Sequence, residues 1–282
     1  MSLESDGLFK YIGLEIEQLE NCIRISQLSY INDLCQMPMS GSADSCSQSP
    51  LDEDQKRRLK SLVGQLMWIS NHSRPDVSYD VCDLSNSLTE ATQRELHMSN
   101  KIIRRLKADD VKLQYPELGN LERSEIVCYT DASYRNLKNN GSQGGQLIFL
   151  KGSNGSYSTI NWKSKKIKRT VKSSEAAEAL ALQEGAELSF VTQSFLKELT
   201  GVELPITLRT DNKSLWNNIH STKQSTDERL QIDISILREM LERQEVAKVE
   251  WVSTEQQLAD CLTKRGASSR KLVSALGGGW RM

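Results

Sequence analysis

The second half of the chain places strand-like and helix-like segments in an order that restricts the fold more than any other feature. Three strand-like segments come first, joined by short turns such as "NNGSQGG", at 126–131, 144–150 and 157–163. Strands with such short connections pair antiparallel. The later segments read as a helix, a strand, two helices, a strand and a helix, at 174–199, 205–211, 212–220, 227–244, 247–253 and 254–266. We therefore predict an α/β domain with a mixed five-stranded sheet flanked by helices.

The first part of the chain reads as mainly helical. Two short strand-like segments, 8–17 and 21–27, precede a polar stretch at 40–54. From Gln55 onward, apolar residues recur at helical spacing in three stretches, with a break at Pro75, which cannot donate a backbone hydrogen bond. This pattern predicts a small helical domain and assigns it no function.

Composition permits a folded protein and narrows its chemistry. The chain has 282 residues, with 38% hydrophobic and 26% charged side chains, which suits two domains with real cores. Its net charge of −1 means that any affinity for nucleic acid must come from local basic patches. Six scattered cysteines without a C-x-x-C pair, and three histidines, do not indicate a zinc site. No signal peptide or membrane-length apolar stretch is present, so we expect an intracellular, cytoplasmic protein.

Carboxylates occur where these elements could bring them together. Asp131 and Asp211 each close a strand, and Glu178 lies near the start of the long helix among small apolar residues. Glu175 is the alternative on that helix, further from the centre of the apolar face. Asp260 lies in the last predicted helix. Each acid alone has a structural explanation, such as capping a helix or lying exposed at a turn.

Four carboxylates that converge would repel one another unless cations lay between them. Magnesium is the expected cation, because hard divalent ions prefer oxygen ligands. Two such ions, with Mn²⁺ as a substitute, could activate water and stabilise the leaving oxygen in phosphodiester hydrolysis. The four acids together therefore predict a nuclease site with two metal ions.

A basic stretch precedes the helix that carries Glu178. It contains six cations and no acid, and a run of this kind is usually a solvated loop. Beside a phosphodiesterase site, contact with phosphates is the better interpretation. The predicted nucleic-acid-binding residues are Lys163, Lys165, Lys166, Lys168, Arg169, Lys172, Ser173, Ser174 and Asn212.

Two sets of motifs resemble the Pol polyprotein of copia-type LTR retrotransposons. "KYIGLEI", "YINDL" and "LVGQLMWISNHSRPDVSYDVCDLSNSL" resemble the end of its reverse transcriptase, which forms the polymerase thumb. "YTDAS", "AEALAL", "RTDNKSLW" and "WVSTEQQLADCLTKRGAS" resemble its ribonuclease H domain. The resemblance implies a ribonuclease H fold over 124–266, a thumb region over 1–120 and a C-terminal tail at 267–282.

Carried over residue by residue, the resemblance implies that Asp131, Glu178, Asp211 and Asp260 are the catalytic and metal-binding acids. It implies cleavage of the RNA strand of RNA–DNA hybrids, with the hybrid and the remainder of the reverse transcriptase or Pol polyprotein as partners and no membrane. Retrotransposon particles are a further expected location. The family's paired polymerase aspartates are absent, so polymerase activity is not expected. No histidine follows His220, which leaves no counterpart for the imidazole that assists some ribonucleases H.

Two alternatives remain open at the level of sequence. Integrases and transposases use a related fold but order their acids Asp, Asp, Glu, whereas here the glutamate comes second. A catalytically inactive or domesticated nucleic-acid-binding remnant would keep the fold without the reaction. Retention of all four acids argues against simple decay.

Overall fold

The computed structural model describes residues 7–38, 48–137, 140–222 and 226–278. The chain divides into two compact units, Met1–Leu113 and Gln114–Met282, and each is described by itself. The sequence pattern had placed this change at 120–124, a few residues further along the chain.

The first unit combines paired strands with a helical core. Strands β1, β2 and β3 pair antiparallel in succession. The segment predicted as one strand over 8–17 is instead a hairpin, because Ile12 and Gly13 have φ angles of 48° and 77° and turn the chain. The elements of this unit are β1 (Leu8–Tyr11), β2 (Leu14–Gln18), β3 (Cys22–Ser26), α1 (Leu28–Asp33), α2 (Glu53–His72), η1 (Pro75–Val77), α3 (Ser78–Asn86), η2 (Leu88–Glu90) and α4 (Gln93–Ala108).

The predicted helical stripes form the core of this unit, with α2, α3 and α4 contributing its buried aliphatic side chains. A fully buried guanidinium ties the elements together. Arg74 forms an ion pair with Asp76 at 2.8 Å and donates to the carbonyl oxygens of Leu106 and Asp109 at the end of α4. The "RPD" motif therefore binds the C-terminal carbonyls of a neighbouring helix.

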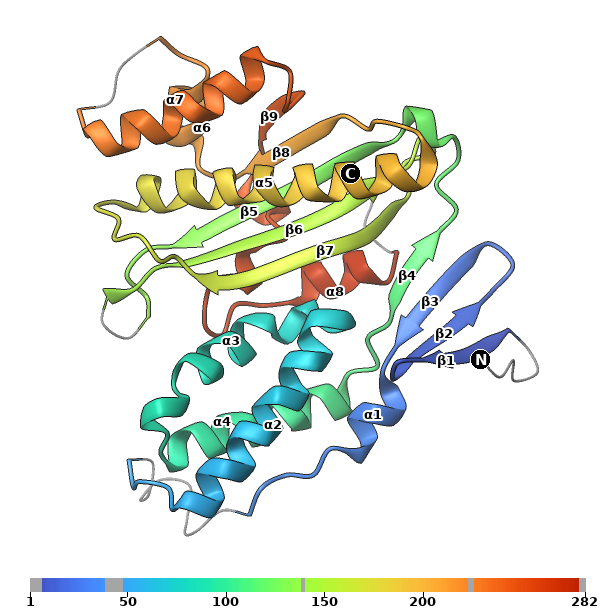
Figure 1. Ribbon diagram of the computed structural model, residues 1–282, viewed down its shortest axis with the longest axis vertical. Helices are drawn as coiled ribbons and strands as arrows, with labels where there is room; N and C mark the ends of the chain where they lie inside the picture. The colour runs from blue at the N-terminus through green and yellow to red at the C-terminus, as the bar shows by residue number, and fades with distance from the viewer. Residues whose placement is uncertain (1–6, 39–47, 138–139, 223–225, 279–282) are drawn as a thin grey trace. The chain divides into compact units, whose positions relative to one another are not determined.

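The second unit contains a five-stranded mixed sheet in the order β7-β6-β5-β8-β9 (Figure 1). Strands β5, β6 and β7 pair antiparallel in succession. Strand β8 pairs parallel with β5, and β9 pairs parallel with β8. The predicted α/β fold class, with a ribonuclease H-like mixed five-stranded sheet, is confirmed. The elements from β4 onward are β4 (Leu113–Pro116), η3 (Leu121–Arg123), β5 (Glu125–Ser133), β6 (Gln143–Lys151), β7 (Tyr157–Lys166), α5 (Ser174–Thr200), β8 (Ile206–Thr210), α6 (Lys213–Ile219), α7 (Glu228–Glu242), β9 (Lys248–Trp251), η5 (Thr254–Gln256), η6 (Asp260–Leu262) and α8 (Arg270–Leu276).

Helix α5 packs along one face of the sheet, and glycine permits the contact (Figure 1). A Cβ atom added at Gly185 would lie 2.5 Å from Cγ2 of Thr130 and 3.1 Å from Sγ of Cys128. On the opposite face, a Cβ added at Gly145 would lie 2.8 Å from side-chain atoms of Leu262 and Thr263. The long helix and the 260–264 segment thus cover opposite faces of the same strands.

The C-terminal part differs from the prediction. Residues 254–266 do not form one helix: they contain two short 3-10 turns, η5 and η6, with Asp260 opening the second. The side chain of Gln257 explains the interruption, because it donates to the carbonyl of Thr130 and accepts from the amide of Ala259, in contacts that a continuous helix would not make. Residues predicted as a tail include helix α8, which buries Leu272, Ala275 and Leu276.

Candidate functional site

Asp131 is buried within strand β5. The strand continues to Ser133, two residues beyond its predicted end, so Asp131 lies inside the strand with 1% of its surface exposed. Its carboxylate accepts a hydrogen bond from the hydroxyl of Thr263. Burial raises the pKa of Asp131 to about 7, and the charges of Asp211 and Asp260 add to this increase.

Glu178 projects from the second turn of α5 and is 7% exposed. Its atom Oε2 is buried and has no hydrogen-bond partner among the described residues. Burial, together with the charges of Asp131 and Asp211, raises the pKa of Glu178 well above its ordinary value. The alternative acid, Glu175, is instead occupied by α6, where it accepts from Ser214 at 3.1 Å and from Asn218 at 2.6 Å.

Asp211 follows the last residue of β8, which pairs parallel with β5. Its atom Oδ2 accepts a hydrogen bond of 3.0 Å from the hydroxyl of Thr254, and its backbone carbonyl accepts one of 3.0 Å from the indole of Trp251. The last residue of β9 and a residue three positions beyond it therefore hold the backbone and the carboxylate of Asp211. Neither contact was predicted from the sequence, although both partners lie in the quoted "WVST" motif.

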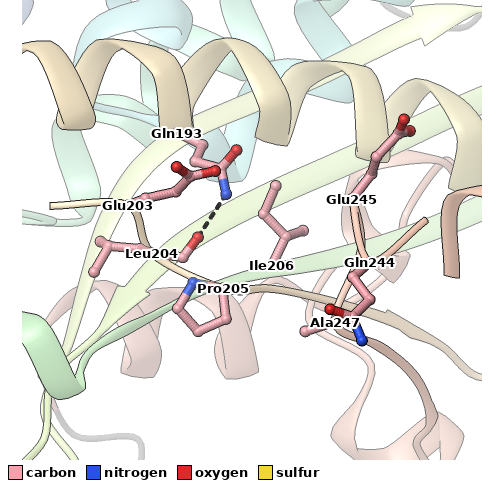
Figure 2. Close-up of a pocket in the computed structure, with 8 residues that line it drawn as sticks. All are labelled: Gln193, Glu203, Leu204, Pro205, Ile206, Gln244, Glu245 and Ala247. Atoms are coloured by element: carbon pink, nitrogen blue, oxygen red, sulfur yellow. Dashed lines mark hydrogen bonds between the residues drawn. The ribbon is translucent and has the colours of Figure 1, made fainter. Parts of the chain in front are cut away.

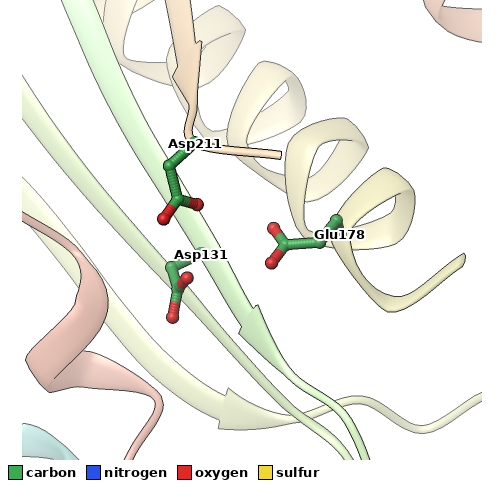
Figure 3. A group of neighbouring side chains, drawn as sticks. All are labelled: Asp131, Glu178 and Asp211. Carbon is green, nitrogen blue, oxygen red and sulfur yellow. The ribbon is translucent and has the colours of Figure 1, made fainter. Parts of the chain in front are cut away.

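The structure brings three of the four predicted acids together. One carboxylate oxygen from each of Asp131, Glu178 and Asp211 lies within 4.8 Å of the other two, and the side chains point toward one another (Figure 3). Burial and the neighbouring charges together raise the free energy of the fully ionised state, as the increases in pKa at Asp131 and Glu178 indicate. Oxygen donors in this arrangement, with the unpartnered Oε2 of Glu178, fit a hard divalent cation.

Asp260 lies beside this group rather than within it. It forms an ion pair with Lys264, and the same ammonium lies 3.7 Å from Oδ2 of Asp131. Burial alone would lower the pKa of Lys264, but the charges of Asp131 and Asp260 raise it, so the lysine stays cationic. Lys264 and Thr263 were not predicted as site residues; a cation four residues after Asp260 was the signal that the sequence offered.

The predicted basic stretch begins in a strand rather than a loop, because β7 extends to Lys166. Two of its cations have internal partners: Lys165 pairs with Glu184 at 3.0 Å, and Arg169 pairs with the buried Asp233 of α7. The side chains of Ser173 and Asn212 cap α5 and α6. Residues Lys166 and Lys168 line a concavity of about 380 Å³ with Arg135. The exposed residues of the predicted set are Lys163, Lys166, Lys168, Arg169, Lys172 and Ser174.

A second concavity, of about 410 Å³, lies at the opposite end of β8 from Asp211 (Figure 2). The residues at the start of β8 line it. The side chain of Gln193 lies across it and donates a hydrogen bond of 2.6 Å to the carbonyl of Leu204. Its two carboxylates, Glu203 and Glu245, are not part of the carboxylate group above. We assign it no chemistry.

The sheet order, with three carboxylates at the junction of β5, β8 and α5, defines the class of the second unit: it has a ribonuclease H-like fold. The foamy viral protease-reverse transcriptase, solved in complex with an RNA/DNA hybrid, aligns with 94% of this chain and 31% of its own, at 12% identity and a TM-score of 0.50. LC11-RNase H1, isolated from compost, aligns with 49% of this chain and 92% of its own, at 18% identity and a TM-score of 0.38. These likenesses concern the fold.

The curated proteins that this chain is similar to are transposon proteins. The Pol polyprotein from transposon RE1 of Arabidopsis thaliana is 27% identical over 277 residues, which is 93% of this chain and 18% of that protein. The putative transposon Ty5-1 protein of Saccharomyces cerevisiae is 30% identical over 182 residues, 57% of this chain and 54% of that protein. No protein-family model matches. The chain is similar in sequence to the Pol polyproteins of copia-type retrotransposons, as its motifs predicted, and it spans only part of the length of these relatives.

Within the described residues, no helix combines the length and the apolar character that crossing a membrane requires.

Proposed function

We propose that this chain hydrolyses the RNA strand of RNA–DNA hybrids, as the ribonuclease H part of a copia-type reverse transcriptase. The observation that carries the proposal is the group formed by Asp131, Glu178 and Asp211, with carboxylate oxygens within 4.8 Å of one another. No structural role explains three acids in such proximity, because two of them are buried and their mutual repulsion costs folding free energy.

The residues present fit divalent metal ions. Asp131, Glu178 and Asp211 would hold the first ion, and Asp260 with Asp131 would contribute to the second. Mg²⁺ bound there, or Mn²⁺ in its place, would supply an activated water and charge stabilisation at the leaving oxygen. Thr263 and Thr254 orient the carboxylates of Asp131 and Asp211 by donating hydrogen bonds.

The basic stretch is proposed to bind phosphates of the hybrid. Because Lys165 and Arg169 already pair with Glu184 and Asp233, the exposed Lys163, Lys166, Lys168 and Lys172 are better placed for this role. The rest of the Pol polyprotein is the proposed protein partner, residues 1–120 would be the thumb of its polymerase, and the cytoplasm or a retrotransposon particle its location.

The test is cleavage of an RNA–DNA hybrid with Mg²⁺, compared with the same duplex made of DNA alone. Asp131→Asn and Asp211→Asn should each abolish cleavage without unfolding the protein, as checked by circular dichroism. Glu178→Gln should reduce cleavage far more than its matched control Glu175→Gln, whose acid contacts α6. Near-normal cleavage by either aspartate variant would refute the assignment.

A second measurement concerns the basic stretch. Replacing Lys163, Lys168 and Lys172 with alanine should weaken hybrid binding and reduce its dependence on salt, because fewer counterions are released from the phosphates. The triple variant Lys165→Ala, Lys166→Ala, Lys168→Ala should show a smaller loss, since Lys165 is paired with Glu184. Equal affinities and parallel salt dependences for all three proteins would show that the stretch is a solvated surface.

A further inference from the structure

An exposed tryptophan lies directly beside the third acid of the site. Trp251 ends the edge strand β9, and 43% of its surface is exposed. Single exposed apolar residues are common and need no explanation alone. This one is held in a fixed orientation, because its indole nitrogen donates to the backbone carbonyl of Asp211 at 3.0 Å.

A cation lies over the same ring. The ammonium of Lys213 is 5.4 Å from the centroid of Trp251, within the range of a cation–π contact. Lys213 opens α6, two residues after Asp211, and its side chain is exposed. An aromatic surface and a cation therefore lie side by side next to Asp211. Trp251 is connected to this acid by a hydrogen bond, and Lys213 follows it closely in the chain.

This combination matches the chemistry of a nucleic-acid strand. Proteins that bind single strands in a groove stack bases on aromatic rings and place cations beside the backbone phosphates. Because Thr254 also holds the carboxylate of Asp211, the ring and the acid are fixed by neighbouring residues of one segment. A strand lying on the ring would consequently pass close to the carboxylates.

We propose that Trp251 and Lys213 hold the RNA strand of the hybrid beside Asp211. The ring of Trp251 contacts a base or ribose next to the phosphate that is cut, and Lys213 contacts the adjoining phosphate. The RNA strand is the one assigned, because the strand that is cut must reach the acids. This inference rests on the proposed function and adds the residues that position its substrate.

The experiment measures binding of an RNA–DNA hybrid with Ca²⁺ in place of Mg²⁺, at several salt concentrations. Trp251→Ala should weaken binding about tenfold, the effect of removing one stacked base, and should leave the salt dependence unchanged because no charge is lost. Trp251→Phe, which keeps an aromatic ring, should bind nearly as well as wild type. Lys213→Ala should weaken binding and lower the salt slope by about one phosphate contact.

A matched control separates this role from general loss of an exposed aromatic. Phe195, 59% exposed on α5, lies 17 residues beyond Glu178, about 25 Å along the helix, and Phe195→Ala should bind as wild type. Binding of Mn²⁺, followed by electron paramagnetic resonance, should be the same in Trp251→Ala as in wild type, since the acids are unchanged and Thr254 still holds the carboxylate of Asp211.

Two results would overturn the inference while leaving the proposed function intact. The first is a wild-type protein that cleaves the hybrid and a Trp251→Ala variant that binds it as tightly. The second is a Trp251→Phe variant that binds the hybrid as weakly as Trp251→Ala, with reduced Mn²⁺ binding in both variants. That result would show that the indole nitrogen acts only by positioning Asp211. A wild-type protein that neither binds nor cleaves the hybrid would refute both proposals.

Discussion

Replacing Asp131 with asparagine should stabilise the metal-free protein at neutral and alkaline pH. The carboxylate is 1% exposed and shares its surroundings with Glu178 and Asp211, so ionising it in the folded state is costly. Asparagine keeps the shape and a hydrogen-bond acceptor for Thr263 but carries no charge. The variant therefore removes the repulsion while preserving the packing.

The size and the sign follow from the pKa of Asp131, which burial raises from 3.8 to about 7. Between these two values the folded protein keeps a proton that the unfolded chain releases. The free energy of unfolding therefore falls as pH rises through this window and reaches its full loss above pH 7. A shift of this size corresponds to about 4 kcal/mol, so we expect Asp131→Asn to gain roughly 2–4 kcal/mol at pH 8 and almost nothing at pH 4.

Urea unfolding at pH 4, 6 and 8 measures this difference, and hydrogen exchange of peptides from β5 assigns the transition to the second unit. Asp110→Asn, in the exposed "KADD" sequence of the first unit, is the control and should change nothing. Adding Mg²⁺ should stabilise wild type and leave Asp131→Asn unaffected, because only the wild type keeps the full set of ligands. If Asp131→Asn is no more stable than wild type at pH 8 without metal, the reasoning from the cost of burying this charge beside other acids is wrong.

Three further predictions test the fold and the site. Gly185→Ala should destabilise the second unit by about 1–3 kcal/mol, because the added Cβ would lie 2.5 Å from a buried side chain. Gly64→Ala should stabilise its helix by up to about 1 kcal/mol, because an added Cβ would have nothing within 4 Å. Chemical unfolding measures both changes. Arg74→Ala should cost the first unit about 3 kcal/mol in the same assay, since Asp76 is left buried without its main partner. Adding Mg²⁺ to metal-free protein at pH 7 should release protons, measurable in weakly buffered solution, and binding should weaken below that pH.

The element order of the second unit and three of its acids could be predicted because each depends on local sequence. Asp131 and Asp211 follow apolar strand residues, and Glu178 lies among small residues that face the sheet. Parallel pairing of β5 with β8 then brings the two aspartates together. Predicting these features requires only the periodicity of the apolar residues and the rule that two parallel neighbouring strands end at the same edge of the sheet.

Features that depend on tertiary contacts were not predictable. The helical pattern at 254–266 is overridden because Gln257 bonds to the carbonyl of Thr130, which lies 127 residues earlier. The partners of Lys165 and Arg169 lie on α5 and α7, so no reading of the basic stretch alone could reveal them. The turn at Ile12 and Gly13 is a different case: the glycine was a visible signal, but the flanking apolar residues suggested one continuous strand.

The close contact between Gly145 and the 260–264 segment affects the order in which the site can form while the chain is synthesised. The carboxylates of Asp131, Glu178 and Asp211 lie on elements synthesised before residue 212, whereas Thr263, which donates to Asp131, and the acid Asp260 come about fifty residues later. Domains fold as units once enough of the chain has emerged from the ribosome. A growing chain can therefore pair β5 to β8 and bring its three acids together first, and it gains β9 and the cover over Asp131 only when about fifty more residues have been made. The three carboxylates would thus lie close together, with Asp131 still uncovered, while the segment that donates to it is being made.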